Sequence, residues 1–154
     1  MKAILLSFVL IILVGINKTR AQEIIELPKY AKDCAVVFDS SYSVNFRLEF
    51  KERFTPRNDQ LIEAERIIKM KYDSLKLGFS YNKLFKYTRQ YLGFIDDLGD
   101  QYITVHFLKI RNKKMEKQYF QNWKEEMILG FGEFYENNLL ILNVNLDKKL
   151  VTFP

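Results

Sequence analysis

The sequence has little of the chemistry on which many enzymes and metalloproteins depend. Its 154 residues include one cysteine, one histidine, 3 prolines and 6 glycines. A single cysteine excludes an internal disulfide framework, and one cysteine with one histidine is too few for a structural zinc site. A glycine-rich phosphate loop is excluded because Gly130 and Gly132 are not followed by the lysine that such a loop needs. We therefore expect no cofactor and no bound metal.

The longest apolar run lies at the N-terminus and has the length of an export signal. Residues 3–16 are apolar apart from one serine and one glycine. A membrane-spanning helix needs about 20 apolar residues, whereas the core of a signal peptide needs roughly 7 to 15. Thr19 and Ala21 are the small residues expected before a cleavage site, so residues 1–21 are predicted to be a signal peptide of a secreted or periplasmic protein. Two basic residues lie unusually close to that site, which leaves a short N-terminal membrane anchor as the alternative.

Removal of the predicted signal peptide leaves a nearly neutral chain. The full sequence has 24 Lys and Arg residues against 19 Asp and Glu residues, a net charge of +5. Residues 1–21 contain three of the basic residues and no acidic one, so the mature chain has 21 basic and 19 acidic residues and a net charge of +2. Binding to nucleic acid needs a concentrated basic face. The sequence therefore predicts no nucleic-acid partner.

The remaining sequence begins with the pattern of a strand followed by a helix. Apolar and polar residues alternate over residues 44–51, which is typical of a half-buried strand. Thr55 and Pro56 favour a helix start, and the apolar residues after them recur at spacings of three and four. Residues 22–43 are predicted to be an extended lead-in to a single domain over residues 44–154. The buried face of the helix is predicted to consist of Leu61, Ala64, Ile67, Ile68 and Tyr72.

From residue 87 onward the pattern is that of an antiparallel meander. Strands are predicted over residues 87–95, 102–110, 139–146 and 150–153, and the meander also includes residues 127–135. This order predicts an α+β fold with one amphipathic helix packed on a four- to five-stranded antiparallel sheet. The arrangement resembles that of cystatin-like modules, which is an analogy of architecture and not of activity.

Three segments also carry a resemblance to known proteins. Residues 53–56 lead into a helix with Ala64 and Glu65, residues 89–93 form a predicted strand, and Trp123 precedes the closing hairpin. This pattern is similar to small exported proteins of Bacteroidetes-type bacteria that have no assigned function. The resemblance covers residues 45–153 and contains no catalytic signature, so it implies a shared fold and an exported location only.

The single histidine limits the nucleophilic chemistry available to the chain. His106 lies in a predicted strand, on the face opposite Ile103, Val105 and Phe107, and is expected to be half exposed. Cys34 is expected to be a buried free thiol, with an intermolecular disulfide as the alternative. A small cell-envelope hydrolase that uses Cys34 and His106 is the alternative function. Four carboxylates are predicted to be ordinary surface charges: Glu49, Glu63, Glu65 and Glu133.

Two groups of residues have the composition of a contact surface. Residues 111–123 combine basic and aromatic residues, a mixture that binding surfaces favour, unless the aromatic side chains pack under the sheet. A second group shares one face of the strand predicted over residues 87–95. We therefore predict a non-enzymatic exported binding or accessory module that recognises a protein, peptide or glycan. The candidate contact residues are Lys113, Lys114, Lys117, Tyr119, Trp123, Tyr87, Arg89 and Tyr91.

The cleavage prediction is tested by the intact mass of the protein isolated from its own cells under non-reducing conditions. We expect a single species that begins at Gln22 and has no added mass on Cys34. A species that retains residues 1–21 would contradict cleavage and favour the anchor.

Overall fold

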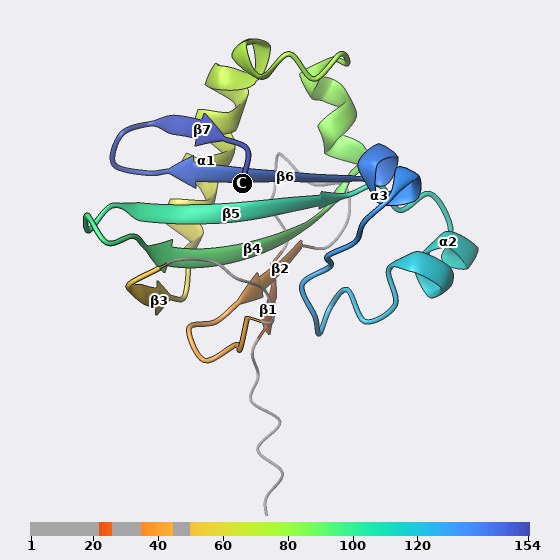
Figure 1. The fold of residues 1–154 in the computed structure, drawn as a ribbon, viewed down its shortest axis with the longest axis horizontal. Helices are drawn as coiled ribbons and strands as arrows, with labels where there is room; N and C mark the ends of the chain where they lie inside the picture. The colour runs from red at the N-terminus through yellow and green to blue at the C-terminus, as the bar shows by residue number, and fades with distance from the viewer. Residues whose placement is uncertain (1–21, 26–34, 45–49) are drawn as a thin grey trace, which may run out of the picture.

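Among the described residues, a seven-stranded mixed sheet forms the centre of the structure, and one long helix crosses one of its faces (Figure 1). The computed structural model describes residues 22–25, 35–44 and 50–154. The strands lie in the order β1-β2-β4-β5-β6-β7. Along the same edge of β4, β2 pairs with residues 89–92 and β3 pairs with residues 93–95. The elements in chain order are β1 (Gln22–Ile25), β2 (Ala35–Phe38), β3 (Glu52–Phe54), α1 (Asn58–Lys71), η1 (Tyr72–Leu75), η2 (Tyr81–Lys86), β4 (Thr88–Ile95), β5 (Gln101–Leu108), α2 (Lys113–Tyr119), α3 (Glu133–Asn138), β6 (Leu139–Asn145) and β7 (Leu150–Thr152).

The α+β class is confirmed, but the sheet has more strands than predicted and is not wholly antiparallel. β1 and β2 belong to the sheet although residues 22–43 were expected to be a lead-in, and β2 is parallel to β4. All residues of β2 are buried, as is usual for a strand with a parallel partner. Such a strand has a continuous apolar sequence, so it lacks the alternation by which strands are recognised. The alternating segment over residues 44–51 falls largely on residues 45–49, outside the described part of the chain.

The predicted buried face of α1 is confirmed, whereas its predicted start is wrong. All the apolar residues expected on that face are at most 5% exposed. The helix begins at Asn58 after Arg57, whose N–H donates to Gln60 Oε1 at 3.0 Å. Thr55 does not cap the helix, because its Oγ1 accepts a hydrogen bond from the Ser40 N–H at 3.0 Å. The hydroxyl thus joins the chain before β3 to the chain after it.

The sheet separates two hydrophobic cores. Ile103, Val105 and Phe107 of β5 point toward α1, as the alternation predicted, and every second residue of β6 from Leu140 to Val144 joins them. The opposite face is covered by the segment that follows α2, from which Phe120 and Trp123 pack against Leu92 of β4. Both faces of the central strands are therefore buried, which explains why β4 shows no exposed polar residue.

A buried ion pair joins α1 to the sheet. Glu65 of α1 and Arg89 of β4 have side chains that are 0% exposed, and Arg89 Nε donates to Glu65 Oε1 at 2.6 Å. The Tyr91 hydroxyl donates to the same carboxylate at 2.7 Å, and the Arg89 guanidinium lies over the Phe107 ring. The prediction that Glu65 is a surface charge is therefore wrong. The apolar spacing of the helix contains no information on the Arg89 side chain that pairs with Glu65.

The chain between β5 and β6 is helical and irregular rather than extended. Residues 127–132 form no regular element, and α3 follows them, so the meander predicted over residues 127–135 is wrong. Ile128 is held instead by side chains of the sheet, because its N–H donates to Gln90 Oε1 at 2.9 Å. Gln90 Nε2 also donates to the Glu126 carbonyl at 2.7 Å. One buried amide thus holds this segment at two of its residues, which a local sequence pattern does not reveal.

The predicted signal peptide lies outside the described residues. Over the ranges that the structure describes, no helix has both the length and the apolar character needed to cross a membrane.

The buried ion pair makes α1 sensitive to one substitution. Glu65→Gln leaves the Arg89 charge buried without its counter-ion, and we expect the free energy of unfolding to fall by about 3–5 kcal/mol. Replacing the network with apolar groups (Glu65→Leu, Arg89→Met and Tyr91→Phe together) should recover most of that loss. Urea denaturation measures both.

The matched control is Glu63→Gln on the solvent side of the same helix. Arg66 and Lys149 lower the pKa of Glu63 to about 2. Solvent screens these exposed pairs, however, so the loss should be only about 1 kcal/mol or less. Equal losses for the two single variants would contradict the role assigned to the Glu65–Arg89 pair.

Candidate anion-binding site

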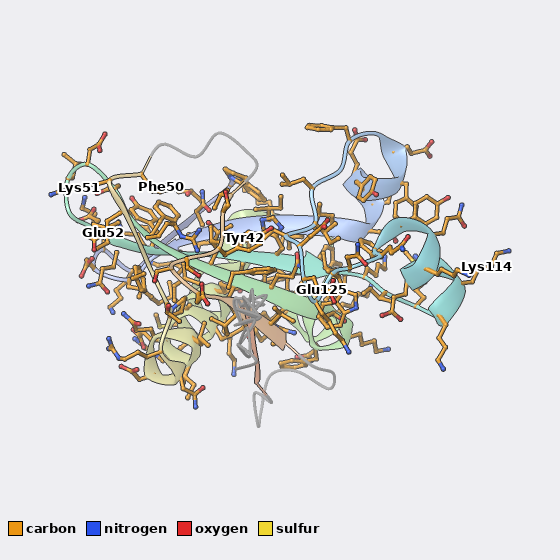
Figure 2. All side chains as sticks on the ribbon, turned by 90° about the horizontal axis from the view of Figure 1, so that it is seen from below. Tyr42, Phe50, Lys51, Glu52, Lys114 and Glu125 are labelled. Carbon is orange, nitrogen blue, oxygen red and sulfur yellow. The ribbon has the colours of Figure 1, made fainter. Side chains whose placement is uncertain are left out.

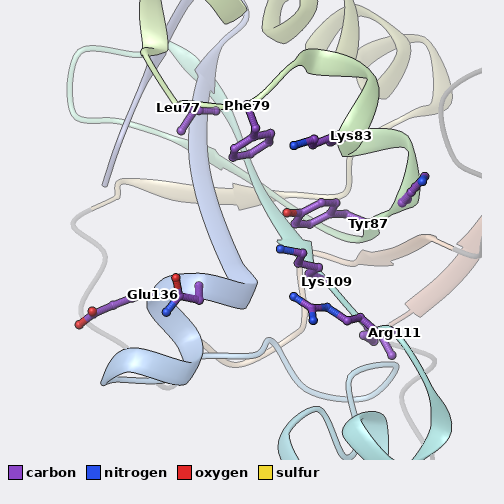
Figure 3. Close-up of a pocket in the computed structure, with 10 residues that line it drawn as sticks. Leu77, Phe79, Lys83, Tyr87, Lys109, Arg111 and Glu136 are labelled. Carbon is purple, nitrogen blue, oxygen red and sulfur yellow. The ribbon is translucent and has the colours of Figure 1, made fainter.

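A pocket of about 760 Å³ opens at one end of the sheet (Figure 3). The register places Thr88 of β4, Leu108 of β5 and Leu139 of β6 side by side at this end. The turn before β4, the turn after β5 and the helix before β6 must therefore meet around the same space. Its lining consists of Leu77, Phe79, Lys83, Lys86, Tyr87, Lys109, Ile110, Arg111, Glu136 and Asn137.

Four of the residues that line this pocket are cationic. Lys83 and Lys86 come from η2, and Lys109 and Arg111 come from the chain that leaves β5. The ends of Lys83, Lys109 and Arg111 point toward the same open space, as does the Tyr87 hydroxyl (Figure 3). Segments far apart in the sequence thus bring their positive charges together.

These cations have no carboxylate partner in the described part of the chain. The ion pairs found there involve other basic residues, namely Arg57, Arg66, Arg89, Lys148 and Lys149. Glu136 is the one acidic residue of the lining, and its carboxylate points away from Lys109 and Arg111 (Figure 3). The lining residues carry four positive charges and one negative charge, so their net charge is +3. Such a concentration of one sign in a concave site attracts anions.

An apolar wall lies beside the charges. The Phe79 and Tyr87 rings are parallel, with centroids 6.4 Å apart, and Lys109 Nζ lies 5.9 Å from the Tyr87 centroid. Burial raises the pKa of Tyr87, and the positive charge of Arg111 opposes part of that shift. The hydroxyl at this wall is therefore protonated at neutral pH and can donate a hydrogen bond to an anion.

The buried ion pair holds this wall in place. Arg89 Nη1 donates to the Tyr87 carbonyl at 2.8 Å, while its Nε binds Glu65. The backbone of Tyr87 is thus fixed from inside the core, and its ring is packed against Phe79 from outside. The position of this wall therefore depends on Arg89, which does not itself line the pocket.

The structure distributes the predicted contact residues over three environments. Tyr87 is 7% exposed and lines the pocket. Arg89 and Tyr91 share its face of the sheet, but that face lies under α1 and both are 0% exposed. Because these two side chains serve the Glu65 network, the hypothesis that they form a contact surface is wrong.

The segment over residues 111–123 is divided in the same way. Lys113, Lys114 and Lys117 are exposed on α2, and Lys114 projects away from the sheet (Figure 2). Tyr119 is half-buried, and the centroid of its ring lies 3.6 Å from the centroid of the Phe134 ring. Trp123 is 7% exposed, and its Nε1 donates to Glu116 at 2.8 Å. The aromatic residues of this segment therefore build the fold, whereas its basic residues face solvent.

His106 lies on the predicted face of β5 but is buried rather than half exposed. It is 1% exposed, and its Nδ1 lies 2.9 Å from the Ile128 carbonyl oxygen, which requires that Nδ1 carries the proton. Burial lowers the pKa of His106 from 6.5 to about 4, so the ring is neutral at pH 7. The imidazole is therefore shielded from any substrate in solvent. Cys34, its partner in the hydrolase hypothesis, lies outside the described residues.

Sequence reasoning identified only part of this pocket. The predicted contact residues and the segment over residues 111–123 include Tyr87 and Arg111 but not Phe79, Lys83 or Lys109. Their only signal in the sequence is that lysines flank two strands at the ends that an antiparallel pairing brings together. In the described ranges, no three His, Cys, Asp or Glu residues lie close enough to hold a metal ion.

Comparison with protein-family models, curated proteins and solved structures found no match to this chain. The function must therefore be argued from the geometry of the pocket.

The buried histidine predicts a loss of stability in mild acid. Between the folded pKa of about 4 and the ordinary value of 6.5, the unfolded state binds a proton on His106 and the folded state does not. Stability is complete above that window and falls as the pH falls through it, by about 3 kcal/mol from pH 7 to pH 4. His106→Gln, which cannot titrate, should lose this dependence in denaturant unfolding measured across the window.

Carboxylates change the stability of the fold in a lower pH range than His106 does. The pKa of Glu63 is lowered from 4.5 to about 2, so its contribution is lost only as the pH falls below 4.5. Parallel loss of stability in the parent protein and in His106→Gln between pH 6.5 and 4.5 would show that His106 is not the group responsible.

Proposed function

We propose that this protein is an exported, non-enzymatic binding module that holds an acidic ligand in the pocket between η2, β5 and α3. The observation that carries this proposal is the convergence of Lys83, Lys109 and Arg111 on one space without a carboxylate partner among the described residues. The proposal that the protein is exported rests on the signal peptide predicted over residues 1–21.

Charge repulsion and partial desolvation favour an anion in this pocket. Like charges that share a concave site repel one another, and a bound anion relieves that repulsion. The apolar wall formed by Phe79, Tyr87 and Ile110 excludes water from one side, which strengthens hydrogen bonds between the cations and an anion. Arg111 offers a planar fork that matches a carboxylate, sulfate or phosphate, and the lysines add point charges around it.

The composition of the lining supports binding rather than turnover. It contains no His, Cys, Ser or Thr residue, and its single carboxylate, Glu136, points away from the cations. Nucleophilic catalysis needs a nucleophile within hydrogen-bond reach of a base. The hydrolase hypothesis gains no support from the pocket, and it depends on a histidine that is 1% exposed.

Sulfate tests the anion site directly. We expect a sulfate titration at constant ionic strength, balanced with chloride, to shift the amide signals of Tyr87, Lys109 and Arg111 in a saturable manner. Arg111→Gln should weaken sulfate binding about tenfold, because it removes a charge-assisted hydrogen bond.

The matched control is Lys114→Gln. It removes the same charge from the surface of α2, outside the lining of the pocket, and should leave the sulfate affinity unchanged. Equal weakening in both variants, or shifts that remain linear with sulfate concentration, would show a general charge effect and overturn the proposed site.

A further inference from the structure

We infer that the acidic ligand of this pocket is a sugar acid, a saccharide unit that carries a carboxylate or sulfate group. The inference rests on the proposed function and adds the class of ligand. It depends on the size of the pocket, the way in which its walls divide into charged, apolar and neutral polar parts, and the access to its aromatic rings.

The pocket is too large for a simple inorganic anion alone. Its volume of about 760 Å³ lies within the range of about 300–1,000 Å³ in which small-molecule ligands bind. Beside the cations, Leu77, Phe79 and Ile110 provide apolar contact. A ligand that fills this space therefore has an acidic group for the cations and a body that packs against apolar side chains.

The lining also contributes one neutral polar side chain. Asn137 of α3 lines the pocket, and its Nδ2 donates to the Glu133 carbonyl at 2.8 Å. One N–H of this amide is engaged in the helix, so Asn137 offers a ligand its Oδ1 acceptor and its second N–H donor. A ligand group that both accepts and donates hydrogen bonds fits this amide. The ring hydroxyls of a sugar acid are such groups.

The Tyr87 ring does not offer the open face that a nucleotide base needs. Figure 3 shows Phe79 on one side of the Tyr87 ring and Lys109 on the other. The stacked Phe79 ring and the Lys109 ammonium 5.9 Å from the centroid thus cover Tyr87, which presents its hydroxyl edge to the pocket. Bases bind to aromatic side chains by stacking on an open face. A puckered sugar ring needs only apolar contact and hydrogen bonds, so the geometry favours it over a planar base.

Calorimetric titration distinguishes these ligands. The probes are digalacturonic acid, neutral galactose, adenosine monophosphate and an Asp-Asp dipeptide, each compared with sulfate at the same ionic strength. We expect digalacturonic acid to bind at least about tenfold more tightly than sulfate, which corresponds to about 1.4 kcal/mol. Neutral galactose should show no saturable binding. A tighter complex with the nucleotide or with the dipeptide would overturn the inference in favour of that class.

Two variants separate the sugar contact from the anion contact. Asn137→Ala should weaken digalacturonic acid several-fold and leave sulfate unchanged, while Asn82→Ala, an exposed asparagine outside the pocket, should change neither. If sulfate binds in the pocket and digalacturonic acid binds no more tightly, the sugar inference fails and the anion site stands. If neither ligand binds, the proposed function fails as well.

Discussion

The buried ion pair between Glu65 and Arg89 is the interaction on which the rest of the structure depends. Taking two charges out of water is expensive, so such a pair is stable only if each remaining polar group also finds a partner. Arg89 meets this condition with three groups, the carboxylate of α1, the carbonyl of Tyr87 and the face of the Phe107 ring. The Tyr91 hydroxyl supplies the carboxylate with a further donor. Helix, central strand and pocket wall are therefore set by one network.

This network gives the surface pocket its rigid side. A ligand site needs side chains whose positions are fixed before the ligand arrives, because ordering them on binding costs free energy. The Tyr87 backbone is held by Arg89, and its ring packs against Phe79, so the phenol stands ready at the pocket. Lys83 and Lys86 are exposed and Lys109 is half-buried, and their long side chains can adapt to the acidic group. We interpret the site as a fixed aromatic and hydroxyl wall with adjustable charges around it.

The sequence predicted the elements whose signals are local and missed those that depend on distant partners. The spacing of Leu61, Ala64 and Ile68 identified the buried face of α1, and the alternation in β5 identified its apolar side. By contrast, the burial of Glu65 depends on a strand 24 residues away, and the segment before β6 is held by Gln90 over 38 residues. Periodicity contains no information on such pairs. The pocket was missed for the same reason, since its lysines are ordinary surface residues until the antiparallel register brings the strand ends together.

The most direct test of the account is the position of a bound sugar acid, observed as intermolecular nuclear Overhauser effects between labelled protein and digalacturonic acid. The account predicts that the ligand protons lie close to the side chains of Tyr87 and Lys109, with the Arg111 guanidinium near the carboxylate. Contacts to Lys113, Lys114 or Lys117 of α2 in place of these residues would contradict it, because the ligand would then occupy the exposed basic surface and not the pocket that the Glu65–Arg89 network supports.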